Sequence, residues 1–144
     1  MKEFALAATA IDAVALRSAL GSDRAGAVVC FEGVVRDHSE DRAVRRLAYQ
    51  AYAPLAEAEG ARIVAAARAR HAIERIVCVH RVGELAIGEI AVFVGISAAH
   101  RDAAFRDVKP FAAQLASSVE VRVMLAELLR VASRGAEARE QLEK

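Results

Sequence analysis

Six stretches of the chain carry the apolar runs, or the alternation of apolar and polar residues, that are typical of β-strands. Gly33, inside the second stretch, predicts a bulge or a close approach of another backbone. Residues 36–42, which follow that stretch, are predicted to form a polar loop. The third stretch is expected to pair with the second, and the fourth and fifth to form a hairpin across "ELAI", 84–87. The predicted strands are residues 4–9, 27–35, 43–52, 75–83, 88–97 and 119–125.

Helices are predicted between these strands, where apolar residues recur at helical spacing or alanine dominates. Pro54 suits the first turn of its helix, whereas Pro110 is expected to kink or end the helix in which it falls, near Lys109. The predicted helices are residues 11–20, residues 54–70, one from about Ala98 and one in the tail up to Arg134. The order βαββαββαβα predicts a single α+β domain over residues 1–144, with a mostly antiparallel sheet and helices packed on it.

Composition narrows the classes of partner. The chain has 144 residues, of which 56% are hydrophobic and only 5% aromatic, so its core is built mainly from alanine, valine, leucine and isoleucine. The formal net charge is +1, from 20 basic and 19 acidic residues. This balance argues against general electrostatic binding to nucleic acid or to an anionic membrane. The few aromatic residues also argue against an RNA-stacking surface.

The cysteines and the N-terminus predict a cytoplasmic protein. Cys30 and Cys78 lie in the apolar runs "AVVCF" and "RIVCVH", and we expect buried free thiols in a reducing compartment. "CVH" at 78–80 lacks the ligand spacing of a zinc site. No apolar run approaches the roughly 20 residues of a membrane span. Glu3 and Asp12 flank the apolar start of the chain, which argues against a secretory signal.

Basic residues occur in three places where predicted strands or helices end or begin. If they converge, they form an anion site, because arginine presents a planar fork of donors and a helix N-terminus presents free N–H groups. The alternative for each is structural: a solvated arginine at a strand end, a core histidine at His80, and ion pairs of Asp37 and Glu84 with nearby arginines. The three places are Arg36 with His38, His80 with Arg81, and His100 with Arg101.

Several separated motifs resemble one protein family in the right order. The chain resembles the large, catalytic subunit of molybdopterin synthase over about residues 25–115, and "EARE" at 137–140 is similar to the C-terminal arm of that family. The matching segments are "GAVVCFEGVVRDH" (26–38), "YAPLAEAEGARIVAAARAR" (52–70) and "VHRVGELAIGEIAVFVGISAAHRDAAF" (79–105).

The resemblance implies a fold, an assembly and a reaction. The fold is an α/β-hammerhead with added antiparallel strands. Two large subunits form a central homodimer, and each binds a small ubiquitin-like sulfur carrier, which gives a heterotetramer. The carrier ends in a Gly-Gly thiocarboxylate that enters the pocket of the large subunit. Sulfur then moves in two steps onto cyclic pyranopterin monophosphate and creates the dithiolene of molybdopterin.

The resemblance also implies site residues. Phe31, Arg36, His100 and Arg101 fall on active-site positions of the family, and Arg139 matches an arginine of its C-terminal arm. We expect Arg36, His100 and Arg101 to be catalytic and to hold the substrate phosphate, with Phe31 and Arg139 adding to substrate binding. Donors placed before the reaction stabilise charge as it develops. No metal or cofactor is implied, because the sulfur arrives on the partner.

One part of the family pattern is missing. The two lysines of the family's C-terminal segment fall on Ala116 and Val123, which can neither transfer a proton nor pair with a carboxylate. One explanation is a weak or inactive relative that still binds the pterin phosphate or the ubiquitin-like partner. A second is a substitute lysine, Lys109 or Lys144. A third is that the segment after about Arg106 reads differently from the working gene product.

A further hypothesis sets the resemblance aside. The order of elements also suits a ferredoxin-like domain that senses a small anionic ligand and forms dimers.

Overall fold

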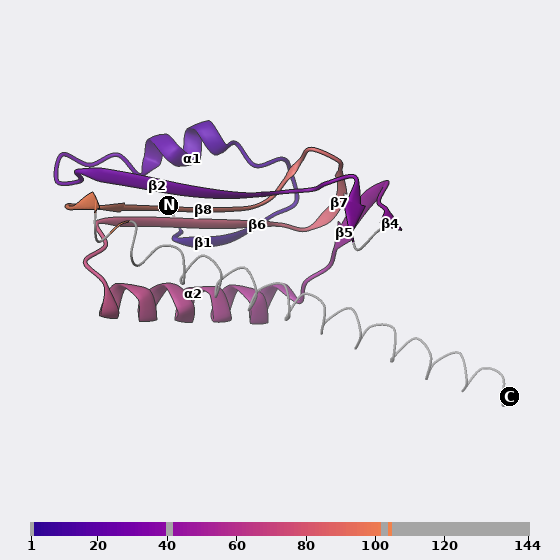
Figure 1. Ribbon diagram of the computed structural model, residues 1–144. Helices are drawn as coiled ribbons and strands as arrows, with labels where there is room; N and C mark the ends of the chain where they lie inside the picture. Colours follow the sequence, from indigo (N-terminus) through magenta and orange to yellow (C-terminus); the bar gives the residue numbers. More distant parts are fainter. Residues whose placement is uncertain (1, 40–41, 102–103, 105–144) are drawn as a thin grey trace, which may run out of the picture.

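A four-stranded sheet lies between two helices, and two small two-stranded sheets lie at one of its ends (Figure 1). The computed structural model describes residues 2–39, 42–101 and 104. The elements are β1 (Phe4–Ala7), α1 (Ala13–Ala19), β2 (Ala27–Val34), β3 (His38–Ser39), β4 (Arg42–Ala43), β5 (Arg46–Tyr49), α2 (Ala53–Arg70), β6 (Arg75–Arg81), β7 (Gly83–Ala86) and β8 (Ile90–Ala98).

The large sheet has the strand order β1-β6-β8-β2. β1 runs parallel to β6, whereas β6 with β8 and β8 with β2 are antiparallel. The smaller sheets pair β3 with β4 and β5 with β7, both antiparallel. The predicted α+β class with a mostly antiparallel sheet is therefore confirmed.

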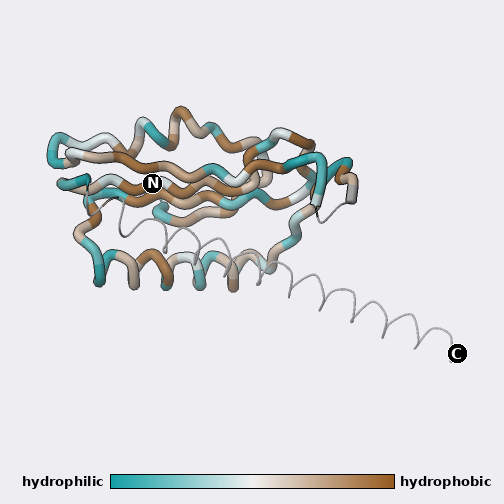
Figure 2. Tube along the Cα trace, viewed as in Figure 1, coloured by the Kyte–Doolittle hydropathy of each residue, from teal (hydrophilic) through white to brown (hydrophobic). Residues whose placement is uncertain are grey.

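The core divides into two layers because side chains alternate across the sheet. On one face, Val92, Val94 and Ile96 of β8 pack against Ile63 and Val64 of α2. Each such fully buried aliphatic side chain contributes about 1.5–3 kcal/mol to stability. Figure 2 shows the hydrophobic residues gathered along the strands of this sheet and the hydrophilic ones at its turns.

The opposite face of the sheet is covered by α1. Leu20, directly after that helix, packs on Val77 of β6 and Phe93 of β8. Gly95 makes this close fit possible, since a Cβ at that position would lie 2.3 Å from the Leu20 side chain. α1 and α2 thus lie on opposite faces of the sheet (Figure 1). A ferredoxin-like arrangement, with its helices on one face, does not fit this topology.

The helix boundaries follow their local sequence. The Asp12 carboxylate accepts a hydrogen bond from the Ala15 N–H at 2.9 Å and so caps α1. Pro54 occupies the first turn of α2, as predicted, where its missing N–H removes no helical hydrogen bond. The predicted bulge at Gly33 is also confirmed, because the pairing of β2 with β8 shifts register between Gly33 and Val34.

Three predictions about the segments that form the two small sheets were wrong. The predicted strand at 43–52 is shorter, Arg46–Tyr49, and pairs with β7 instead of β2. The predicted loop at 36–42 contains the β3–β4 pair. The predicted antiparallel pairing of the fourth and fifth strands is confirmed as β6 with β8, but "ELAI" is not a simple turn between them, because most of it belongs to β7. The physical reason is burial: Leu85 of β7 is 1% exposed and packs against Val35, so this segment joins a small core of its own.

The last predicted elements lie mostly outside the described residues. β8 continues to Ala98, where a helix was expected to begin. The Ala104 N–H then donates to the His100 carbonyl at 3.2 Å, which is the hydrogen bond of one helical turn. The strand predicted at 119–125, the helix up to Arg134 and the kink at Pro110 fall on residues that the structure does not describe.

Candidate functional site

The predicted site residues lie along the antiparallel pair β2–β8. Within this pair, Ala27 lies opposite Ala98, and Gly33 lies opposite Val92. Arg36 follows β2 beyond its last residue, at the Val92 end of the ladder. His100 and Arg101 follow β8 beyond Ala98, at the other end. The two halves of the predicted anion site therefore lie at opposite ends of the same two strands.

The separation of the two halves is too large for one arginine side chain to bridge. At roughly 3.3 Å per residue, the backbones of Arg36 and His100 are on the order of 30 Å apart. The expected convergence of all three basic stretches does not hold within one chain. Two of the three do share an end, since His80 pairs with Val92 near the end of β6 and Arg81 follows it.

At the Arg36 end, the side chains on the surface are polar and exposed. Arg36 is exposed. The Asp37 carboxylate lies 2.7 Å from the His38 ring nitrogen Nδ1, so its partner among the described side chains is a histidine, where an arginine was expected. Arg46 and Glu84 form the expected ion pair at 3.3 Å across β5 and β7. This end thus combines a guanidinium with an oriented imidazole on a solvent-facing surface.

Beneath that surface, His80 and Arg81 are buried. His80 is 1% exposed, its Nδ1 lies 2.7 Å from the Arg81 carbonyl, and its ring meets Tyr49 edge-on at 4.9 Å. The interpretation of His80 as a core histidine is confirmed. Arg81 is also buried and pairs with Glu89 at 3.5 Å. Neither side chain therefore offers its charge to a ligand at the surface.

At the other end, His100 and Arg101 are both exposed directly after the fully buried end of β8. Gly26 lies beneath them, where a Cβ would come within 2.4 Å of the Ala99 carbonyl oxygen. Any larger residue at this position would push the two strands apart. The glycine thus allows the chain that carries the pair to cross close to the start of β2.

Phe31 lies between the two ends, on the outer strand of the sheet. It is 44% exposed, and Val28 (39%) and Val34 (51%) on the same strand are exposed as well. Among the described strands, β2 pairs only with β8, so its other edge has no partner strand. An exposed edge with apolar side chains is a template for pairing with another chain.

The two cysteines are free, as predicted, but only Cys78 is buried; Cys30, on the edge strand β2, is partly exposed. Burial raises the pKa of the Cys78 thiol well above its usual range. Burial also raises the pKa of the Cys30 thiol, and the nearby Arg17 charge offsets part of that rise. Since the thiolate is the reactive form, both thiols are poor sulfur donors or acceptors.

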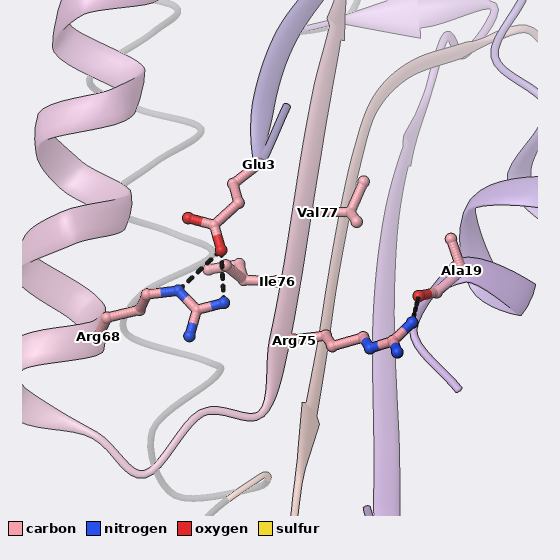
Figure 3. Close-up of a pocket in the computed structure, with 6 residues that line it drawn as sticks. All are labelled: Glu3, Ala19, Arg68, Arg75, Ile76 and Val77. Atoms are coloured by element: carbon pink, nitrogen blue, oxygen red, sulfur yellow. Dashed lines mark hydrogen bonds and ion pairs between the residues drawn. The ribbon is translucent and has the colours of Figure 1, made fainter. Parts of the chain in front are cut away.

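The structure also contains a cavity of about 280 Å³ at the start of β6 (Figure 3). Its two arginines already have partners. Arg68 donates to the Glu3 carboxylate, and Arg75 donates to the Ala19 carbonyl at 3.0 Å. The cavity contains none of the predicted site residues, and its charges are internally satisfied. Its lining residues are Glu3, Ala19, Arg68, Arg75, Ile76 and Val77.

Two kinds of feature are absent from the described part of the chain. Residues 2–39, 42–101 and 104 contain no group of three or more side chains suited to hold a metal ion. Over the same residues, neither helix combines the length and the apolar composition needed to span a membrane. The predicted substrate-binding residue Arg139, and the lysine positions Ala116 and Val123, lie outside these residues.

Known proteins resemble this chain in sequence and in fold. The family model described as MoaE protein matches residues 6–115. The molybdopterin synthase catalytic subunit of Aspergillus niger is 41% identical over 96 residues, which cover 67% of this chain and 53% of that relative. The chain thus spans about half the length of the curated relatives it matches.

Solved structures show the same fold. Molybdopterin synthase from Staphylococcus aureus matches with a TM-score of 0.72 and 32% identity, over 80% of this chain and 83% of that chain. A protein–protein complex of subunits 1 and 2 of the molybdopterin-converting factor from Helicobacter pylori matches with a TM-score of 0.66 and 20% identity, over 78% and 77%. At this lower identity the likeness concerns the fold alone.

Proposed function

Because this chain belongs to the MoaE protein family, whose model matches residues 6–115, we propose that it is the catalytic subunit of a molybdopterin synthase. Molybdenum cofactor biosynthesis is the process that this membership supports. The proposed partner is a small ubiquitin-like carrier with a C-terminal thiocarboxylate, and the proposed substrate is cyclic pyranopterin monophosphate. The whole of residues 1–144 is proposed to act as one domain, in the cytoplasm.

In the proposed reaction the carrier supplies the sulfur and this chain supplies the binding groups. Each transfer replaces one carbon–oxygen bond of the pterin side chain by a carbon–sulfur bond, and the displaced oxygen leaves as water or stays on the opened phosphate. It also converts one thiocarboxylate of the carrier into a carboxylate, with water supplying the oxygen. The substrate phosphate must stay in place through two such transfers. Exposed guanidinium groups at Arg36 and Arg101, with the His100 imidazole, have the charge and the donor geometry for that task.

The observation that carries the proposal is the position of these three residues at opposite ends of β2–β8. One chain alone does not form the anion cradle, so we infer that two copies form it together. If two β2 strands pair antiparallel along their exposed edges, the end of one strand lies beside the start of the other. Arg36 of one copy then lies two strand spacings, about 10 Å, from His100 and Arg101 of the second copy.

The exposed edge of β2 is suited to this pairing. It is eight residues long, and Val28, Phe31 and Val34 expose apolar surface along it. Pairing two such edges about a twofold axis is isologous, so it buries the same surface on both copies and ends after one contact. The homodimer that the family resemblance implies thus has a physical reason here: it completes the site.

A second candidate function is binding without turnover. Ala116 and Val123 stand where the family has lysines, and neither side chain can move a proton. A relative of this kind would retain the pterin and the carrier but transfer sulfur slowly or not at all.

Single-turnover formation of molybdopterin distinguishes the two functions. The purified chain is mixed with thiocarboxylated carrier and cyclic pyranopterin monophosphate, and the same carrier ending in an ordinary carboxylate is the control. Product that depends on the thiocarboxylate is the expected result. Binding of carrier and pterin without product would favour the second function, and failure to bind either would contradict both.

A further inference from the structure

Arg81 is a buried charge whose partners satisfy it only in part. Its side chain is 6% exposed at the end of β6. Nη1 lies 3.5 Å from the Glu89 carboxylate, and Nη2 donates to the Glu84 carbonyl at 3.3 Å. Its buried Nε has no hydrogen-bond partner among the described residues. Replacing a buried ion pair by apolar side chains of similar volume often leaves a protein at least as stable, so stability alone does not explain this arginine.

Glu89 connects Arg81 to the turn between β7 and β8. One carboxylate oxygen, Oε1, faces Arg81, and the other, Oε2, accepts a hydrogen bond from the Ala86 N–H at 2.7 Å. The Glu89 N–H also donates to the Ala86 carbonyl at 3.2 Å. Gly88 allows this tight turn, because its φ of 88° lies in the left-handed region that favours glycine. The ion pair therefore fixes the shape of the turn.

That turn holds the residue that precedes Arg36. The Val35 N–H donates to the Glu89 carbonyl at 3.0 Å, and the Gly88 N–H donates to the Val35 carbonyl at 2.8 Å. Both backbone groups of Val35 are thus bound to the turn. Its side chain, 5% exposed, packs against Leu85. The chain leaves this fixed point and enters solvent at Arg36.

We propose that the Arg81–Glu89 ion pair is a positioning device that aims Arg36 at the substrate phosphate. The proposal rests on the proposed function, since it assigns that phosphate to Arg36. Arg81 and Glu89 do not touch the substrate. They fix the turn, the turn fixes Val35, and Val35 fixes the direction in which Arg36 leaves the protein. A small displacement at this point matters, because misplacing a binding group by about 1 Å can cost up to about a hundredfold in rate.

The chain provides a matched control pair. Arg46 and Glu84 form an ion pair of similar length, 3.3 Å, within the neighbouring β5–β7 sheet. Their side chains are 70% and 68% exposed. Glu84 contacts Arg81 through its backbone carbonyl, which Glu84→Gln leaves in place. Removing this exposed pair changes charge near the site without loosening the hydrogen bonds of Val35.

The test measures backbone protection first. We call the Arg81–Glu89 ion pair the clamp. The clamp variants are Arg81→Met and Glu89→Gln, and the controls are Arg46→Met and Glu84→Gln. We expect amide hydrogen exchange at Val35 and Gly88 to become at least about tenfold faster in the clamp variants and to stay unchanged in the controls. Exchange at buried β8 amides checks that each variant remains folded. If Arg81→Met does not fold, Glu89→Gln, which keeps an oxygen acceptor for Ala86, gives the result alone.

The second measurement is pterin affinity, taken with and without Arg36. Glu89→Gln is expected to weaken binding of cyclic pyranopterin monophosphate about tenfold in the normal chain. In an Arg36→Ala background it should change the affinity less than twofold, because the group it positions is gone. An equal loss in both backgrounds, or no change in exchange at Val35, would overturn the proposal. If the unmodified chain binds no pterin, the proposed function fails, while the exchange experiment still decides whether the clamp exists.

Discussion

The two ends of the β2–β8 strand pair both expose basic side chains, but different parts of the structure hold them in place. At the Arg36 end, a small second sheet, a tight turn and the ion pair of buried Arg81 with half-buried Glu89 surround the point where the chain emerges. At the His100 end, the fully buried strand β8 simply stops at Ala98 and exposes the pair after it. One end is held by polar contacts and the other by the packing of a central strand.

This difference indicates a division of roles within a shared site. The position of His100 and Arg101 follows from β8, which is the most buried strand of the sheet. Arg36 follows an edge strand that is broken by a bulge, and an edge strand needs additional contacts to define its end. If two copies meet along β2, His100 and Arg101 of one copy, which follow the buried strand β8, lie near Arg36 of the other copy, which the Arg81–Glu89 pair positions.

The largest expected effect comes from removing the guanidinium groups. Arg36→Ala and Arg101→Ala should each weaken pterin binding about ten- to hundredfold, because each removes charge-assisted hydrogen bonds to phosphate. Both side chains are exposed, so the unfolding transition should hardly change. Isothermal titration under anaerobic conditions measures the affinity. Arg45→Ala, exposed near Arg36, is the matched control, and equal losses at all three positions would indicate a general charge effect.

A smaller effect is expected from the edge of β2. Val28→Lys places a charge on the exposed edge and should weaken self-association at least about tenfold, since lysine on an edge strand opposes pairing. Turnover should fall with the dimer fraction, while the free energy of unfolding changes by about 0.5 kcal/mol or less. Sedimentation measures the association. Val14→Lys, 77% exposed on α1, is the control, and an unchanged dimer in Val28→Lys would exclude this edge.

The smallest effect is expected at the cysteines. Burial raises the pKa of both thiols, so each forms less thiolate at pH 8 than a free cysteine does. Alkylation by iodoacetamide at pH 8 should be at least about tenfold slower in the folded chain than in the unfolded chain. Mass spectrometry reports the modification. Rapid alkylation of Cys78 in the folded chain would contradict its burial, and loss of turnover in Cys30→Ala would give that thiol a role.

Much of the fold could be predicted from the sequence, because local signals and burial agree there. Pro54 in the first turn of α2 and the bulge at Gly33 each follow from the chemistry of one residue. The pairing of β5 was not predictable in this way. Sequence order favours pairing with the preceding strand, whereas β5 joins β7, which follows it by more than 30 residues. Only the burial of Leu85 against Val35 reveals that choice.

The site shows the same limit. The sequence indicated which residues form the predicted site, Arg36, His100 and Arg101, but it did not indicate how far apart they lie. Arg36 and His100 each follow one of two strands that are neighbours in the sheet, which suggests proximity. The antiparallel register then places them at opposite ends. The contribution of Glu89 was also missed, because a glutamate in a "GE" turn has no distinguishing signal in the sequence until its partner Arg81 is known to be buried.

Mixing two inactive variants tests the shared site most directly. Arg36→Ala and Arg101→Ala chains are purified separately, dissociated together and allowed to reassociate. If each site takes Arg36 from one copy and Arg101 from the other, half of the random dimers are mixed, and each mixed dimer has one intact site. About a quarter of all sites should then recover molybdopterin formation or pterin binding. A mixture no more active than the average of the two variants would show that each site lies within one chain, and would contradict the account.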